Sequence, residues 1–436
     1  MEAEIGSGHM ARAGWRFCST TMRGEPAQMT MITDPVQTAT LPDGEGPDGQ
    51  LRPTRRGRLV ATAAATVVGM GIFAFGYSLG GYFANSEGEP ATVIAATWAR
   101  DHGLGGVVAV AEDFYYGNID TVEAGGAPEI SAELEGQSAA NAVPDGSASA
   151  PPHLNPPANM TSPAAETVAG EGVWQPVASS VDGVPAVYAT RIRPDDVYTS
   201  QFASLMWFDP KLADFTMIPG YQEPGGESPT EGALPQNEWS RVLANFNGAF
   251  RLQDTGGGYY YNGTEVAPLQ EGIASTVIYK DGSIKVGEWG RDFTMTPEVA
   301  VVRQNLHLLL DGGVSKASDG FSWGATTHGE NLAWRSAIGQ REDGSVVYVG
   351  SPGLSAESMA DTLVRAGVAR AMVLDMNDWW VAGFYFTHDA NGAPVCHKLD
   401  PNIQEGCDRF LKSYKRDSFQ VLAKPGMAVG GEQPKP

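Results

Sequence analysis

An uncharged, apolar run near the N-terminus constrains this chain more than any other feature. Residues 59–84 read LVATAAATVVGMGIFAFGYSLGGYFA, which is long enough to cross a hydrocarbon layer of about 30 Å as a helix. Residues 85–170, which follow it, contain twelve acidic residues and one basic residue. Four arginines lie just before the run: Arg52, Arg55, Arg56 and Arg58. Since cations favour the inner side of a membrane, the pattern predicts a single-pass signal anchor in the cytoplasmic membrane, with its N-terminus inside and the following domain extracytoplasmic.

A cleaved signal peptide is the alternative for residues 59–84. The apolar stretch of a signal peptide spans about 7–15 residues, and the run here is much longer. Within the run, Gly76 and Gly80 have the spacing that lets two helices approach closely. Glycine is common in single-pass helices, so a plain anchor in the lipid bilayer and a helix–helix contact both remain open.

The charge balance limits the partners of this chain. The net charge is -22, with 29 Lys plus Arg against 51 Asp plus Glu. So few cations cannot neutralise a phosphate backbone, and we therefore expect no nucleic-acid partner.

Composition divides the rest of the chain into segments. We expect a disordered cytoplasmic segment at 1–58 and a disordered tail at 424–436. Residues 85–171 read as a membrane-proximal helix at 90–101 and an acidic tether, because 124–170 are rich in Ala, Pro, Ser, Gly and Glu. The folded domain is expected at 172–423.

Hairpin signals define the fold class of that domain. Asp281-Gly282 separates two strand-like runs at 274–280 and 283–289, and Asp343-Gly344 separates 335–341 from 346–350. Further predicted elements are strands at 186–192, 202–208 and 369–374, and helices at 234–244 and after the N-cap residue Ser355. Hairpins mixed with few helices predict an α+β domain with mixed, mostly antiparallel sheets, preceded by one transmembrane helix and a flexible tether.

Two cysteines lie close together in the outer part of the chain. Cys396 and Cys407 could close a surface loop as a disulfide. A zinc site with His397 is the competing interpretation, although the other ligands are missing at any recognisable spacing. We expect no metal and no cofactor.

Asp375 is the most suggestive carboxylate, because it ends a buried strand and should emerge at the rim of a sheet. Burial could raise its pKa, or a cation could hold it charged. Asn377, Asp378 and Trp379 follow, with Trp380 behind them, and could form the wall of a sugar site. A turn aspartate and tryptophans of the core are the alternatives.

Three more polar residues are candidates. Arg335 opens an apolar strand and suits either a phosphate or a structural ion pair. Asn247 and Asp311 each close an apolar run next to glycine, where a simple turn would serve equally well.

The order of these motifs resembles the phosphodiester glycosidase family over about residues 173–423. The matching segments are Asn247-Gly-Ala-Phe, Leu309-Leu-Asp-Gly, Arg335-Ser-Ala-Ile-Gly, Asp343-Gly, the helix after Ser355, and Leu374-Asp. Within the family the chain resembles a membrane-anchored actinobacterial branch, which has segments like those at 280–282, 302–306 and 323–326.

The resemblance implies hydrolysis of a sugar-1-phosphodiester in cell-envelope glycans. It assigns Asp375 and Asp311 as the carboxylates, Arg335 as the phosphate contact and Asn247 as a sugar contact. Family members typically read Asp-Gly-Gly-Gly-Ser where this chain reads Asp375-Met-Asn-Asp-Trp379. Bulky residues in place of glycines favour the alternative, a non-catalytic envelope glycan-binding or membrane-complex assembly protein with the same fold.

Overall fold

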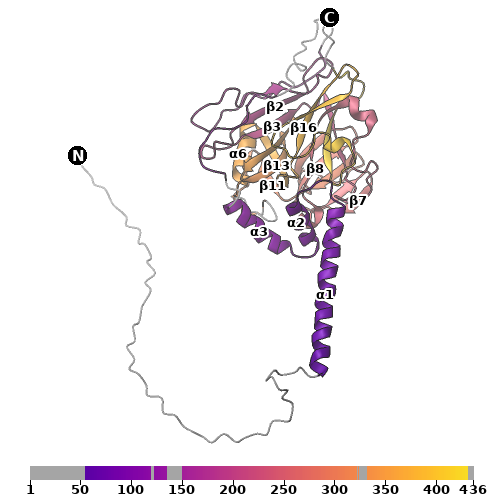
Figure 1. Cartoon of the computed structure of the whole chain (residues 1–436). Helices are drawn as coiled ribbons and strands as arrows, with labels where there is room; N and C mark the ends of the chain where they lie inside the picture. The colour runs from indigo at the N-terminus through magenta and orange to yellow at the C-terminus, as the bar shows by residue number, and fades with distance from the viewer. Residues whose placement is uncertain (1–54, 119–121, 135–149, 322, 324–330, 431–436) are drawn as a thin grey trace, which may run out of the picture. The chain divides into compact units, whose positions relative to one another are not determined.

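The computed structural model describes residues 55–118, 122–134, 150–321, 323 and 331–430 (Figure 1). The chain divides into two units, Met1–Ala74 and Phe75–Pro436, and the second contains the whole β-sheet domain. Most of the predicted cytoplasmic segment, 1–58, lies outside the described residues.

Helix α1 spans Arg55–Ala84 and so contains the apolar run 59–84. Among the helices in the described part of the chain, none is both long enough and apolar enough to cross a membrane. The transmembrane helix therefore remains a prediction. Helix α2, Ala91–Asp101, confirms the helix predicted at 90–101. A further helix that the sequence did not predict, α3, follows at Gly105–Asn118.

Three sheets form the domain, and the ladders between their strands are antiparallel. In the eight-stranded sheet the spatial order is β1 (Gln175–Pro176), β2 (Val187–Ile192), β3 (Ala203–Phe208), β14 (Val346–Leu354), β13 (Ala333–Arg341), β15 (Val368–Met376), β11 (Leu308–Asp311) and β12 (Val314–Ser315). The first five-stranded sheet runs β7 (Thr264–Ala267), β6 (Tyr259–Tyr261), β10 (Val299–Gln304), β8 (Ala274–Tyr279) and β9 (Ile284–Glu288). The second runs β17 (Pro394–Lys398), β16 (Gly383–His388), β5 (Val242–Asn247), β18 (Ser418–Ala423) and β4 (Ala213–Ile218). The α+β class and both predicted hairpins are confirmed.

The predicted helix at 234–244 is wrong. A short 3-10 helix, η1 (Gln236–Arg241), occupies its first half, and the buried strand β5 occupies its second half. The run VLANFN is apolar enough to suit a helix or a buried strand, and β5 forms because β16 and β18 pair with its two edges.

The largest hydrophobic core lies where the sheets face one another. Phe246 of β5 stacks on Tyr348 of β14 at 4.6 Å and on Phe419 of β18 at 5.3 Å between ring centroids. Helix α6, Ala356–Arg365, covers the eight-stranded sheet with Met359 and Leu363. As predicted, Ser355 is its N-cap and accepts a hydrogen bond from the Ser358 backbone N–H at 3.0 Å.

The predicted tether is in part packed against the domain. Among the described residues of 124–170, buried apolar side chains include Ala132, Leu134, Met160 and Ala164. Arg191 donates to the carbonyls of Ser131 and Glu133, which fixes the backbone of this segment. The described part of the predicted tail also packs, since Val429 forms a β-bridge with Val181. Both segments were assigned from composition, which does not register such backbone contacts.

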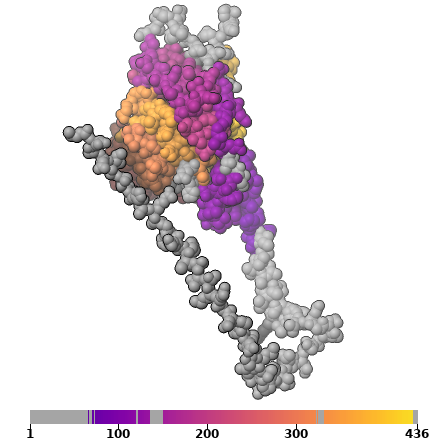
Figure 2. Space-filling view, turned by 90° about the vertical axis from the view of Figure 1, so that its left-hand side faces the viewer, coloured from indigo at the N-terminus to yellow at the C-terminus, as the bar shows by residue number. Residues whose placement is uncertain are grey.

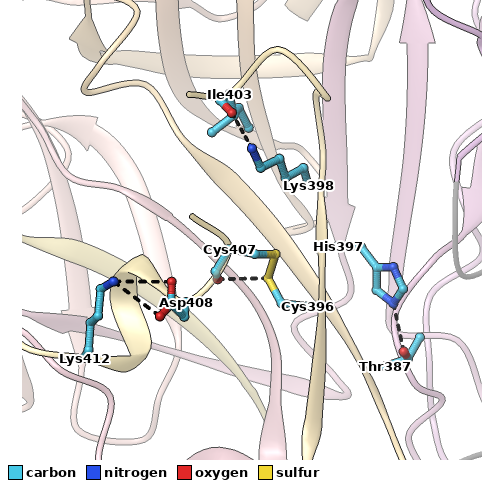
Figure 3. Close-up of a disulfide and its surroundings, with 8 residues drawn as sticks. All are labelled: Thr387, Cys396, His397, Lys398, Ile403, Cys407, Asp408 and Lys412. Carbon is cyan, nitrogen blue, oxygen red and sulfur yellow. Dashed lines mark hydrogen bonds and ion pairs between the residues drawn. A yellow bond between two sulfur atoms is a disulfide. The ribbon is translucent and has the colours of Figure 1, made fainter. Parts of the chain in front are cut away.

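The predicted disulfide between Cys396 and Cys407 is confirmed (Figure 3). It joins β17 to the loop that precedes the short 3-10 helix η2 (Arg409–Leu411). His397 points away from the two sulfur atoms, and its ring bonds the Thr387 hydroxyl at 2.9 Å. The zinc interpretation is therefore wrong, because both thiols are consumed by the disulfide.

Removal of this disulfide should lower the free energy of unfolding by about 3 kcal/mol, the chain-entropy value for so small a loop. Urea unfolding of the Cys396→Ala/Cys407→Ala double variant would measure the loss. Cys18→Ala is the control, since Cys18 takes no part in the bridge. A double variant as stable as that control would contradict the prediction.

Candidate active site

A buried serine hydroxyl joins two sheets where Asn247 and Asp375 meet. Ser336 Oγ accepts hydrogen bonds from Asn247 Nδ2 at 3.0 Å and from the Asp375 backbone N–H at 3.1 Å. It donates to the Asp375 carbonyl at 2.9 Å. The carboxyl ends of β5 and β15 are thus held together, and two of the residues predicted from the sequence lie side by side.

The Asp375 carboxyl group is buried against a cation. Asp375 is only 4% exposed. Oδ1 accepts from the Met376 backbone N–H at 2.8 Å, and Oδ2 lies 3.0 Å from Arg416 Nη1. Burial raises the pKa of Asp375 to about 7, against the opposing effect of the Arg416 guanidinium. A carboxyl group with this pKa can exchange a proton near neutral pH, as an acid–base catalyst must.

Besides Arg100 of α2, two arginines of the β domain line the space beside Asp375, and neither was predicted from the sequence. Arg416 lies over the Trp380 ring, 3.8 Å from its centroid. Arg251 pairs with Asp254 at 2.9 Å and with Asp101 of α2 at 2.7 Å. Guanidinium groups have the geometry to bind a phosphate, and in this structure Arg251 and Arg416 are engaged by carboxylates of the protein.

The space itself consists of two adjoining cavities. A chamber of about 50 Å³ lies directly at Asp375, and Arg100, Glu112 and Tyr116 of α2 and α3 form part of its wall. A larger cavity of about 650 Å³ shares Arg251, Trp380 and Arg416 with that chamber. The larger cavity is enclosed by the last turns of α1, by helix α2 and by the loop around residue 222. It has room for a sugar. Figure 2 shows the purple surface of the helical segment against the β domain.

A second carboxyl group, Glu223, lines the larger cavity. Burial raises its pKa, while the nearby Arg416 and Arg251 guanidinium groups lower it. The Glu223 backbone N–H donates to the Lys415 carbonyl at 2.9 Å, which holds this loop beside Arg416. The sequence offered no signal for Glu223, which stands in a loop without a recognisable motif.

The backbone at Asn377 retains the conformation of a glycine. Its φ is +101°, a value that disfavours most side chains but is more accessible to asparagine. Its Oδ1 accepts from the Trp379 backbone N–H at 2.9 Å, so the side chain stabilises its own turn. Asn377 lines the small chamber. A residue that tolerates a positive φ thus occupies this turn.

The next two predicted binding residues turn away from the cavities. Asp378 accepts a hydrogen bond from Gln404 Nε2 at 2.6 Å. Trp379 lies under the Arg409 guanidinium, 5.7 Å from its ring centroid, and neither residue lines the two cavities. Trp380 lines both cavities and is the tryptophan that could contact a sugar.

Asn247 and Arg335 support the site from within the protein. The Asn247 amide bonds the Gly248 carbonyl, the Ser336 and Tyr348 hydroxyls and the Ala382 N–H, at 2.8–3.1 Å. Arg335 is fully buried and donates to the carbonyls of Leu354 and Trp323, each at 2.8 Å. Burial lowers the pKa of Arg335 to about 10. Neither residue is among those that line the two cavities, so the sugar and phosphate contacts expected of them stay predictions.

Asp311 is not brought to this site. It is partly exposed and pairs with Arg291 at 2.7 Å and with Arg370 at 3.6 Å. In the β11–β15 ladder, Leu310 is opposite Ala371, which leaves Asp311 near the start of β15 and Asp375 near its end. The structure therefore does not bring Asp311 to Asp375, and the register of β11 against β15 that separates them has no local signal in the sequence.

A fully buried ion pair lies behind Arg416. Arg303 Nε is 3.0 Å from Asp417 Oδ2, and the two side chains are 0% and 1% exposed. Arg303 also donates to the carbonyls of Phe250 and Gln304. A Cβ atom at Gly248 would collide with the Asp417 carboxylate, so only glycine fits there. The pair fixes the segment that presents Arg416 to Asp375.

No cluster of metal ligands accompanies these groups. In the part of the chain that the structure describes, no three His, Cys, Asp or Glu side chains converge as a metal site requires.

Residues 240–375 match the sequence model of the phosphodiester glycosidase family. The matched segment ends on Asp375 and includes Asn247, Arg251 and Arg335, whereas Glu223 and Arg416 lie outside it. A search of curated proteins found no match to the chain.

Three solved structures illustrate what the chain is similar to. The catalytic domain of zebrafish N-acetylglucosamine-1-phosphodiester alpha-N-acetylglucosaminidase, auto-inhibited by its pro-peptide, is 16% identical; the match covers 63% of this chain and 87% of that one, with a TM-score of 0.34. A Synechocystis protein is 10% identical, with 56% and 64% covered and a TM-score of 0.30. An exported protein from Burkholderia pseudomallei is 10% identical, with 53% and 75% covered and a TM-score of 0.26. The family resemblance inferred from the sequence is confirmed by the match of residues 240–375 to the phosphodiester glycosidase family.

Proposed function

We propose that this chain is a membrane-anchored, extracytoplasmic hydrolase of sugar-1-phosphodiester linkages in cell-envelope glycans. The observation that carries the proposal is the buried Asp375 carboxyl group with a raised pKa, beside two arginines, in a segment that matches the phosphodiester glycosidase family. A protonated carboxyl next to cationic side chains suits a reaction that breaks a bond to a phosphate.

The residues suggest a division of roles. Arg416 and Arg251 would bind the phosphate, and Trp380 would contact the sugar. Protonated Asp375 would donate its proton to the phosphate oxygen as the bond from that oxygen to the sugar C1 breaks. Water would then form the new bond to C1 and lose its proton to Glu223. Two carboxyl groups in these roles are the usual machinery of glycoside hydrolysis.

The predicted location rests on the sequence and on the disulfide. Arginines precede residues 59–84 and acidic residues follow them, which favours an N-terminus inside and a domain outside. Disulfides persist mainly in oxidising compartments, so the Cys396–Cys407 bridge supports an extracytoplasmic domain.

A turnover assay tests the proposal. The full chain, purified in detergent, is incubated with a GlcNAc-1-phosphodiester and with analogues that carry other sugars. We expect the release of free sugar and a phosphomonoester in equal amounts from at least one of them. Binding without any turnover across the panel would reject the hydrolase.

One observation favours the alternative, a non-catalytic glycan-binding or assembly protein. Helices α2 and α3 wall in the Asp375 chamber, whose volume of about 50 Å³ is too small for a sugar. For an assembly role, Gly76 and Gly80 could carry a helix–helix contact, since a Cβ atom at either position would meet nothing within 4 Å. A cell-wall pull-down run beside the turnover assay separates the two functions, because only the alternative predicts glycan capture without product.

A further inference from the structure

Helix α3 exposes a row of large apolar side chains. Val107 is 66% exposed, Val110 71% and Phe114 59%, and Leu104, just before the helix, is 44% exposed. Positions 107, 110 and 114 follow the spacing that places side chains on one face of a helix. A patch of exposed apolar side chains marks an interaction surface, whereas single exposed apolar residues are common on protein surfaces.

The charged residues of α3 lie outside this row. Glu112 and Asp113 are its only charged residues. Glu112 is on the opposite side of the helix and Asp113 is at the flank of the row, and both side chains are bonded within the protein. Glu112 accepts two hydrogen bonds from Arg100, each at 2.7 Å, and Asp113 accepts one from Asn331 at 2.8 Å. Val108, one turn before Glu112, is buried on the same side of the helix as Glu112. A helix on a water-exposed surface has the opposite arrangement, with charges outward and apolar residues inward.

Contacts between aromatic and polar side chains fix α2 to the last turns of α1. Trp98 of α2 packs on Phe75 at 4.9 Å, and its indole N–H donates to Ser78 Oγ at 3.0 Å. The Tyr82 hydroxyl donates to Asp101 at 2.8 Å. Since only a short turn separates α2 from α3, these contacts also hold α3 close to the last turns of α1, Phe75–Ala84.

We propose that the outward face of α3, formed by Leu104, Val107, Val110 and Phe114, docks on a lipid bilayer. An amphipathic helix in such a position lies in the plane of the interface, with its apolar side about 5–10 Å deep. This face carries no charged residue, so neither a charged protein partner nor anionic lipid is needed to recognise it. Trp98 and Tyr82, with apolar rings and polar tips, suit the same interfacial depth. The proposal rests on the membrane anchor of the proposed function and not on its hydrolysis.

Fluorophores placed on α3 test this docking. Val110→Cys and Phe114→Cys are made in a Cys18→Ser background and labelled with the environment-sensitive dye NBD. Val364→Cys on α6 is the control, since Val364 is also an exposed valine on a helix, at 41%. The full chain is placed in phosphatidylcholine nanodiscs, which leave both membrane faces accessible. Quenching is measured with doxyl-labelled lipid and, separately, with aqueous iodide.

We expect blue-shifted emission and strong doxyl quenching at positions 110 and 114, with iodide quenching at 364 only. Adding phosphatidylglycerol should not change the pattern. Iodide quenching at 110 and 114 equal to that at 364 would overturn the proposal. Protection from both quenchers would also overturn it, because a second copy of the chain would then cover the face. The quenching results do not depend on whether the chain hydrolyses any substrate, so the docking proposal and the hydrolase proposal can fail separately.

Discussion

Asparagine at position 375 is expected to lower kcat/KM for a sugar-1-phosphodiester by about 10²- to 10⁴-fold, the usual contribution of a general acid–base group. Asn cannot supply the proton that the leaving phosphate would need. The substitution keeps the size of the side chain and leaves Ser336 bonded to the backbone of residue 375. The loss should therefore appear in turnover and not in folding. Steady-state kinetics and a urea unfolding curve of the same preparation measure both.

The dependence of kcat/KM on pH tests whether Asp375 is the group that donates the proton. Since burial raises the pKa of Asp375 to about 7, the carboxyl group is protonated below that pH and ionised above it. A general acid must be protonated, so kcat/KM of the wild type should fall as the pH rises through about 7. Residual activity of Asp375→Asn should lack this fall. Asp361→Asn, on the exposed face of α6, removes the same charge elsewhere and should leave the profile unchanged. A profile without the fall in the wild type would remove Asp375 as the acid.

Local signals predicted much of the fold. The Asp281-Gly282 turn and the Ser355 cap depend on neighbours within a few residues, and both were predicted correctly. The error at 234–244 has a different origin. Whether VLANFN forms a helix or a strand is decided by β18, which lies more than 170 residues further along the chain. Partners at that distance leave no trace in local periodicity.

The candidate site was predicted in part for the same reason. Asp375 stood out because it follows a buried apolar strand, and Asn247 because it closes another. Arg416 lies in a run of charged residues, Lys415-Arg416-Asp417, that reads as an exposed loop. It becomes a site residue only because β18 pairs with β5 and so carries this run to the end of β15. Arg335 is the opposite case. Its place in an apolar strand suggested a phosphate contact, but its guanidinium donates hydrogen bonds to backbone carbonyls.

Alanine at position 417 is expected to lower the free energy of unfolding by about 3–5 kcal/mol, the cost of breaking a buried ion pair from one side. Arg303 would remain fully buried with its charge no longer balanced by Asp417. Urea unfolding followed by tryptophan fluorescence measures the change. Asp408→Ala is the matched control. Its pair with Lys412 spans 3.3 Å but is more than half exposed, so its loss should cost about 1 kcal/mol or less.

A second variant tests whether the cost comes from the stranded charge. Arg303→Met/Asp417→Leu removes both charges and should recover much of the stability lost in Asp417→Ala, because neither residue then leaves a buried ion. If the double variant is no more stable than Asp417→Ala, the cost arises from lost packing around Gly248 and not from the charge of Arg303. The turnover of the double variant then shows what the pair does for the site. Since Asp417 follows Arg416 directly, a stable double variant with reduced kcat would mean that the pair positions Arg416 against Asp375.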